Sequence, residues 1–269
     1  MVALKRVRPA GWWFDGLLLA AFVAITVGVA DRALIGMDVW LRDWCDAHRP
    51  GVLYWPAWVG NHLGQGGWLT SICGILALLL AWRRHSVRPV LVVIVAFALT
   101  FCTLTPMKDI TNRPAADANV EHAGRAWARG YFGVGGASYP SGHLVNSIVW
   151  YGVLALLLSA WLPVVWRRVI RVVPPAVLGV TTVYLSFHWL TDTVAGLLFG
   201  LFLDRIMRRI PWDELPLGRW LASSGWDAPG LGVGPAQPRG DRSREPAAAA
   251  DSGRRGRVPA GPPPGGSAA

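Results

Sequence analysis

The sequence is 269 residues long, with 53% hydrophobic residues, only 16% charged residues and 26 Lys and Arg against 16 Asp and Glu. A charged fraction this low excludes an ordinary water-soluble domain, in which about 25% of residues carry a charge. Four uncharged stretches of 33, 19, 37 and 20 residues separate Arg49 from Arg83, Arg88 from Lys108, Arg129 from Arg167 and Arg171 from Asp192.

Such stretches can form membrane-spanning helices, since a spanning helix needs about 20 apolar residues. We predict an all-α, polytopic membrane protein with six transmembrane helices, at residues 12–30, 65–82, 89–107, 142–162, 170–187 and 189–207. Lys5, Arg6 and Arg8 precede the first segment, so a cleaved signal peptide is the alternative interpretation of it. We favour a span, although Asp15 interrupts it, because the apolar run is longer than in a usual signal peptide and no typical cleavage site follows.

The connection between the first two spans, residues 32–64, has an amphipathic pattern. Apolar residues recur there at helical spacing: Leu34, Met37, Leu41, Trp44 and Cys45. Charged residues fall on the other side: Asp38, Arg42, Asp43, Asp46 and Arg49. The pattern predicts an amphipathic helix at the membrane interface, with a solvated connector as the alternative.

Basic residues are divided unevenly between alternate connections. With a cytoplasmic N-terminus, the inner segments and the tail hold 19 of the 26 Lys and Arg, and the outer segments hold 7. The positive-inside rule therefore predicts a cytoplasmic N-terminus (1–11), a transmembrane catalytic domain (12–210) and a cytoplasmic tail (211–269). The tail is basic and rich in Pro and Gly, which predicts that it is largely disordered. Because topology explains the excess of positive charge, we expect no nucleic acid partner.

Cysteine usage indicates neither disulfides nor a zinc site. Cys73 and Cys102 fall inside predicted spans, and Cys45 stands alone outside them. No Cys and His spacing matches a zinc motif, so no metal is predicted.

His188 and Asp192 are four residues apart at the start of the last predicted span. On a helix this spacing lets the carboxylate accept a hydrogen bond from one imidazole nitrogen and leaves the other nitrogen free to react. Ionisable groups at membrane depth are costly and commonly functional. We therefore expect a nucleophile or base at His188, with a simple helix-end cap as the alternative.

A second polar group, Ser141-Gly142-His143, lies where the fourth span begins. Ser141 can cap the helix, Gly142 allows a ligand close to the backbone, and the free N–H groups of the first turn favour a bound anion such as phosphate. Lys108 and Arg113 add two cations on the same side of the membrane. A plain helix start and cation contacts with lipid headgroups are the alternatives.

Together these residues resemble the three motifs of the type 2 phosphatidic acid phosphatase (PAP2) superfamily of membrane lipid phosphatases and phosphotransferases. The resemblance covers residues 35–209 in layout, and its most specific parts are Pro-Ser-Gly-His at 140–143 and His-Trp-x-x-Asp-x-x-Ala-Gly at 188–196. It implies a six-helix bundle with an extracytoplasmic site. His188 is then the nucleophile that forms a phosphohistidine, Asp192 orients it and His143 protonates the leaving oxygen. The resemblance also implies that the phosphate is held by Lys108, Ser141 and the Gly142 N–H.

Two departures from the family pattern concern the arginines that usually clamp the phosphate. The family pattern places these arginines at positions 115 and 182, where this sequence has Ala115 and Thr182. Arg113 is expected to take over phosphate binding, with Arg125 or Arg129 as alternatives. We expect an active enzyme with an altered clamp, because the other ionisable residues of the motifs remain: Lys108, His143, His188 and Asp192.

The expected reaction is hydrolysis of a lipid phosphate or diphosphate, of polyprenyl, phosphatidic acid or phosphatidylglycerophosphate type. No cofactor is expected, because histidine supplies the nucleophile and cations neutralise the phosphate. One alternative is a phosphotransferase of the same fold, which passes the phosphate to a sugar or inositol hydroxyl. Another is a non-catalytic lipid-binding protein whose basic tail recruits an anionic partner. No oligomeric state is predicted.

Overall fold

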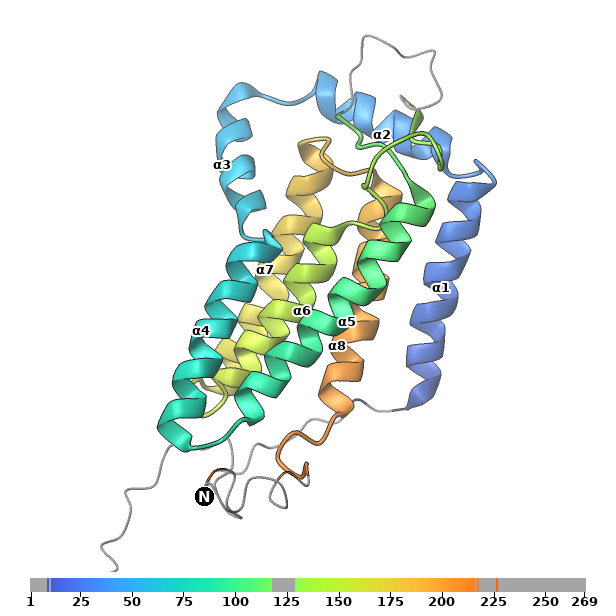
Figure 1. Ribbon diagram of the computed structural model, residues 1–269. Coiled ribbons are helices and arrows are strands. Elements are labelled where there is room, and N and C mark those ends of the chain that lie inside the picture. The colour runs from blue at the N-terminus through green and yellow to red at the C-terminus, as the bar shows by residue number, and fades with distance from the viewer. Residues whose placement is uncertain (1–8, 10, 118–128, 216, 218–225, 227–269) are drawn as a thin grey trace, which may run out of the picture. The chain divides into compact units, whose positions relative to one another are not determined.

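Figure 1 shows the helical arrangement in a computed structural model, which describes residues 9, 11–117, 129–215, 217 and 226. All of these residues belong to the first of two compact units, residues 1–236. The described residues contain no β-strand and form eight helices: α1 (Trp12–Ala30), α2 (Ile35–Ala47), α3 (Gly51–His62), α4 (Gly66–Arg84), α5 (Arg88–Thr111), α6 (Gly142–Leu157), α7 (Val164–Tyr184) and α8 (Leu190–Arg209).

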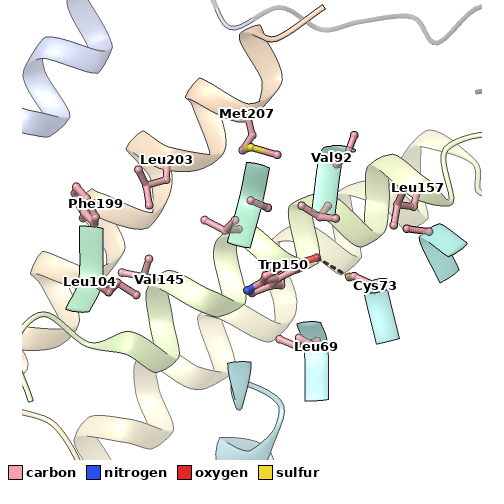
Figure 2. Close-up of a cluster of buried hydrophobic side chains, with 14 of the residues drawn as sticks. Leu69, Cys73, Val92, Leu104, Val145, Trp150, Leu157, Phe199, Leu203 and Met207 are labelled. Carbon is pink, nitrogen blue, oxygen red and sulfur yellow. Dashed lines mark hydrogen bonds between the residues drawn. The ribbon is translucent and has the colours of Figure 1, made fainter. Parts of the chain in front are cut away.

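The central helix is α6, which contacts α4, α5, α7 and α8, while α1 packs against α8 (Figure 1). The sequence of α6 explains its central position, because the helix is apolar on nearly all sides and such a helix must be buried. Trp150 of α6 is 1% exposed, and its carbonyl accepts a hydrogen bond from the Cys73 thiol of α4 at 3.7 Å (Figure 2). The surrounding core includes Leu69, Val92, Leu104, Val145, Phe199 and Leu203.

The outer helices turn apolar side chains away from the protein. Leu17 and Val23 of α1, Ile75 of α4, and Phe97 and Phe101 of α5 are all at least half exposed. Within the described ranges, α1, α4 and α5 are long and apolar enough to cross a membrane by length and composition. These exposed faces therefore suit contact with lipid rather than water.

The all-α fold is confirmed, and six of the helices, α1 and α4 to α8, coincide with the six predicted spans. The largest boundary difference is at the fourth and fifth spans, because α6 ends at Leu157 and α7 already begins at Val164, after the N-cap Pro163. Helix α7 thus carries three arginines in its first turns, and α8 carries Asp204 and Arg205. Six membrane crossings stay a prediction.

Between the first two spans the structure has two helices, α2 and α3, where one was expected. Helix α2 lies across one end of the bundle (Figure 1). The buried side of α2 is mixed, because it holds Asp38 and Arg42 together with Ile35 and Cys45. The exposed side carries Trp40 and Trp44 as well as Asp43 and Asp46. The predicted helix is therefore present, but two of its charged residues contact protein and its two tryptophans face the surroundings.

Candidate active site

The predicted site residues meet at the end of the bundle that α2 covers. Helix α5 ends there and brings Lys108, α6 begins there and brings His143, and α8 begins there and brings Asp192. The short connection from α7 to α8 adds His188. Segments far apart in the sequence therefore converge because the consecutive helices α5, α6, α7 and α8 alternate in direction (Figure 1).

His188 is held from behind by a carboxylate and a hydroxyl. Its Nδ1 lies 3.0 Å from Ser138 Oγ and 3.5 Å from Asp192 Oδ2, and the Ser138 hydroxyl donates to the same Asp192 oxygen. Because the Ser138 proton points to Asp192, the Ser138 oxygen accepts the Nδ1 proton of His188. The second imidazole nitrogen, Nε2, then carries a lone pair. Ser138 was missed from the sequence, since no motif spacing singles it out.

His143 lies beside the second imidazole nitrogen of His188. Its Nδ1 lies 3.3 Å from His188 Nε2, and the two rings are 69° apart with centroids separated by 5.5 Å. The side chain projects from the first turn of α6, which begins at the N-cap Ser141. The two imidazoles are therefore within hydrogen-bonding distance of each other in this structure.

Lys108 and Gly142 lie side by side next to the histidine pair. A side-chain carbon at position 142 would be only 3.4 Å from Lys108 Cε and 3.6 Å from its Nζ, so glycine leaves the backbone open beside the ammonium. Lys108 Nζ also donates to the carbonyl oxygens of Ala137 and Pro140, the latter at 3.3 Å. An ammonium group next to a helix N-terminus favours a bound anion.

Ser141 caps α6 as predicted, with its Oγ accepting the Leu144 N–H at 3.5 Å. Its side chain is fully buried, and its N–H donates to the Asp192 carbonyl at 3.0 Å. The close approach of α8 depends on Gly196, because a side-chain carbon there would lie 2.8 Å from the Ser141 carbonyl oxygen. The glycine at the end of the last motif thus sets the distance between α6 and α8, the two helices that carry His143 and Asp192.

Arg113 was expected to bind phosphate together with Lys108, but the structure places its side chain elsewhere. It is completely buried behind the histidines, where it donates to the Gly130 carbonyl at 2.6 Å, to Thr191 Oγ1 at 2.8 Å and to Asp192 Oδ1. Another of its N–H groups bonds Asp38 Oδ2 at 2.6 Å. With its donors engaged and no exposed surface, Arg113 orients Asp192 in this structure, and its prediction as part of the phosphate clamp is not supported.

Asp38 of α2 completes this buried network and was placed by sequence reasoning on the polar face of an interfacial helix. Its Oδ1 accepts the Thr191 N–H at 2.9 Å, so it caps the first turn of α8 from another helix. Its Oδ2 accepts from Thr191 Oγ1 as well as from Arg113. A chain of contacts therefore runs from Asp38 through Arg113 and Asp192 to His188.

The residues at or near the positions of the missing family arginines do not supply a phosphate clamp where the structure describes them. Thr182, at one family arginine position, is buried and donates to the Leu178 carbonyl at 2.6 Å, while its own carbonyl accepts the His188 N–H at 3.2 Å. Arg129 is exposed, and Arg125 lies outside the described residues. Thr182 therefore anchors the backbone of His188.

Tyr139, in the segment that leads into α6, is buried, and its burial changes the pKa of its hydroxyl. Tyr139 is 1% exposed, and its hydroxyl shares a hydrogen bond of 2.6 Å with Thr26 of α1. Burial raises the pKa of Tyr139 to about 12, so this hydroxyl remains protonated. It ties the segment that leads into α6 to the outer helix α1.

Comparison with known proteins gives consistent matches. A sequence model of the PAP2 superfamily matches residues 89–216. Phosphatidylglycerophosphatase B of Bacillus subtilis (strain 168) is 26% identical over 204 residues, or 73% of this chain and 91% of that protein. The crystal structure of a transmembrane PAP2-type phosphatidylglycerolphosphate phosphatase from Bacillus subtilis has a similar fold, with a TM-score of 0.58 and 22% identity over 72% of this chain and 94% of that one.

Proposed function

The chain belongs to the PAP2 superfamily of membrane phosphatases, and we propose that it hydrolyses the phosphate ester of a membrane lipid through a phosphohistidine intermediate. The observation that carries the proposal is the His188 imidazole, whose Nδ1 is engaged by Ser138 and Asp192 while its Nε2 faces His143. This arrangement provides a nucleophile, the group that orients it and an acid within one site.

In the first step, His188 Nε2 attacks phosphorus and the bond from phosphorus to the lipid oxygen breaks. Positive charge develops on the imidazole, and the Asp192 carboxylate stabilises it. The His143 imidazolium donates its proton to the departing lipid oxygen, because an alkoxide is a poor leaving group without protonation. The products of this step are the lipid alcohol and the phosphohistidine.

In the second step, water attacks phosphorus and breaks its bond to His188 Nε2. The neutral His143 left by the first step accepts the water proton, which restores its acid form for the next turnover. Inorganic phosphate then leaves. Lys108 and the Gly142 N–H at the positive end of α6 are our proposed phosphate-holding groups in both steps. Ser141 was also expected to hold phosphate, but it is completely buried, and we propose that it supports the site by capping α6.

Phosphatidylglycerophosphate is the first substrate to test, because the relative from Bacillus subtilis is named for it. We expect the full-length protein, purified in detergent, to release inorganic phosphate from this lipid. Phosphatidic acid and a polyprenyl diphosphate should be measured in parallel, each with and without sugar and inositol acceptors. Formation of a phosphorylated acceptor would instead favour phosphotransfer. No phosphate release and no transfer in any combination would favour a non-catalytic lipid-binding role.

We further propose that the site faces the extracytoplasmic side and that both termini are cytoplasmic, on the basis of the uneven division of Lys and Arg. In a variant without the native cysteines, Asp31→Cys should react with a membrane-impermeant maleimide in intact cells, because Asp31 is exposed at the end of α1 near the site. Gly253→Cys, in the tail, should react only after the cells are opened. The reverse labelling pattern would invert the topology.

A further inference from the structure

A cavity lies at the end of the bundle opposite the histidine pair. Its volume is about 400 Å³, and it is enclosed by α6, the first turns of α7 and the last turns of α8. Val149, Val153, Leu156 and Met207 form its apolar wall. None of these residues belongs to the candidate active site, so the cavity is a separate feature of the protein.

Arginine side chains gather around this apolar space. Arg167, Arg168, Arg171 and Arg208 line it, against the two carboxylates of Asp204 and Asp213. Asp204 is engaged by Arg171 through Oδ1 and by Arg208 through Oδ2 at 3.0 Å. Two of the arginines are therefore neutralised in part by one aspartate, and the lining keeps an excess of positive charge.

Among the groups that line the cavity, Arg167 Nε and Ser159 Oγ are buried and have no hydrogen-bond partner in the part of the chain that the structure describes. An unsatisfied buried donor is costly, and such groups commonly mark a missing ligand or water. The cavity thus combines donors and positive charge with an apolar wall, which is the complement of an anionic amphiphile.

We propose that this cavity binds an anionic phospholipid, with an acyl chain against the apolar wall and the headgroup phosphate at Arg167 and Arg168. An aliphatic chain fills the apolar space, and an arginine can form charge-assisted bonds with two phosphate oxygens at once. The protein's own tail is a poorer occupant, because residues 218–269 contain seven arginines against four acidic residues and are repelled by the arginine lining.

Native mass spectrometry of the full-length protein in a neutral detergent tests this site. We expect dioleoylphosphatidylglycerol to be retained at least about tenfold more strongly than dioleoylphosphatidylcholine, since a factor of ten reflects only one strong polar contact. The double variant R167Q/R168Q should lose this preference. The tail variant R254Q/R255Q removes the same charge and should keep it. Retention that is equal for the two lipids, or unchanged in R167Q/R168Q, would overturn the proposal.

Three further measurements distinguish lipid bound in this cavity from lipid bound at the active site and from binding of a free anion. His188→Ala should retain the lipid like the wild type, because the proposed site is remote from the catalytic one; loss there would place the lipid at the active site and overturn the assignment. Inorganic phosphate and glycerol 3-phosphate should not displace the lipid, whereas displacement would indicate a simple anion site. Leu156→Trp fills the apolar space and should weaken retention even if R167Q/R168Q does not fold. Hydrolysis of a soluble aryl phosphate checks that each lining variant is folded.

Discussion

His188→Ala should abolish turnover of every phosphate ester, with kcat lowered by about 10⁴-fold or more, as expected when a covalent nucleophile is removed. In the proposed mechanism His143 serves as the acid, so it does not replace His188 as the nucleophile. The loss should be equally complete with a lipid phosphate and with an activated aryl phosphate. Both substrates require the same attack on phosphorus, whatever their leaving group.

His143→Ala should show a different pattern because its proposed role is to protonate the leaving oxygen. For a lipid phosphate, whose alkoxide leaves poorly, kcat should fall by about 10²- to 10⁴-fold. For an aryl phosphate with a good leaving group, formation of the phosphohistidine should be nearly unaffected. A rapid-mixing experiment that follows release of the aryl alcohol measures this step separately from the later hydrolysis.

A matched control is His62→Ala, which removes a histidine of α3 whose Nδ1 bonds the Trp58 carbonyl at 2.8 Å. It should leave the ratio of the two activities near that of the wild type. If His143→Ala instead slows alcohol release from both esters equally, the separate roles of nucleophile and acid are wrong. If His188→Ala still forms a phosphorylated enzyme, another residue is the nucleophile.

The fold was largely predictable because membrane helices are encoded by long uncharged stretches. The six predicted spans coincide with α1 and α4 to α8. The burial of Asp38 and Arg42 on α2 was not predictable, since an amphipathic pattern shows that two faces differ but not which residues contact protein. Asp38 bonds Arg113, and Arg42 lies over the ring of Trp189, and both of these contacts come from segments distant in sequence.

The sequence identified the candidate site residues that share a motif, but not those that join them only in the folded chain. His143 and His188 belong to short recognisable strings, and the structure brings them within 3.3 Å. Ser138 and Asp38 lack any such signal. Arg113 was identified as important, but its position next to Lys108 in sequence suggested a phosphate contact, whereas three-dimensional packing turns its guanidinium toward Asp38 and Asp192.

Replacing Arg113 should therefore impair catalysis and stability together. Arg113→Ala leaves Asp38 and Asp192 buried without their shared cation, and breaking such a buried pair costs about 3–5 kcal/mol of folding free energy. Arg113→Lys keeps the charge, but an ammonium cannot span two carboxylates as the planar guanidinium does. We expect Arg113→Lys to fold with a lowered melting temperature and to reduce kcat by about 10- to 100-fold, by analogy with groups that orient a histidine in metal sites.

Asp38→Asn distinguishes this positioning role from a phosphate clamp, because Asp38 bonds Arg113 and Thr191 from the side away from the histidines. It should lower kcat in the same direction as Arg113→Lys, while KM and inhibition by inorganic phosphate stay close to wild type. Asp43→Asn, on the same helix with a side chain that is 58% exposed, should change neither value. If Arg113 were instead a phosphate clamp, Arg113→Lys would raise KM and weaken inhibition by inorganic phosphate. Because Asp38 contacts the site through Arg113 and Thr191, a shared kcat defect with unchanged phosphate affinity would mean that α2 sets the orientation of Asp192, and through it that of the nucleophile.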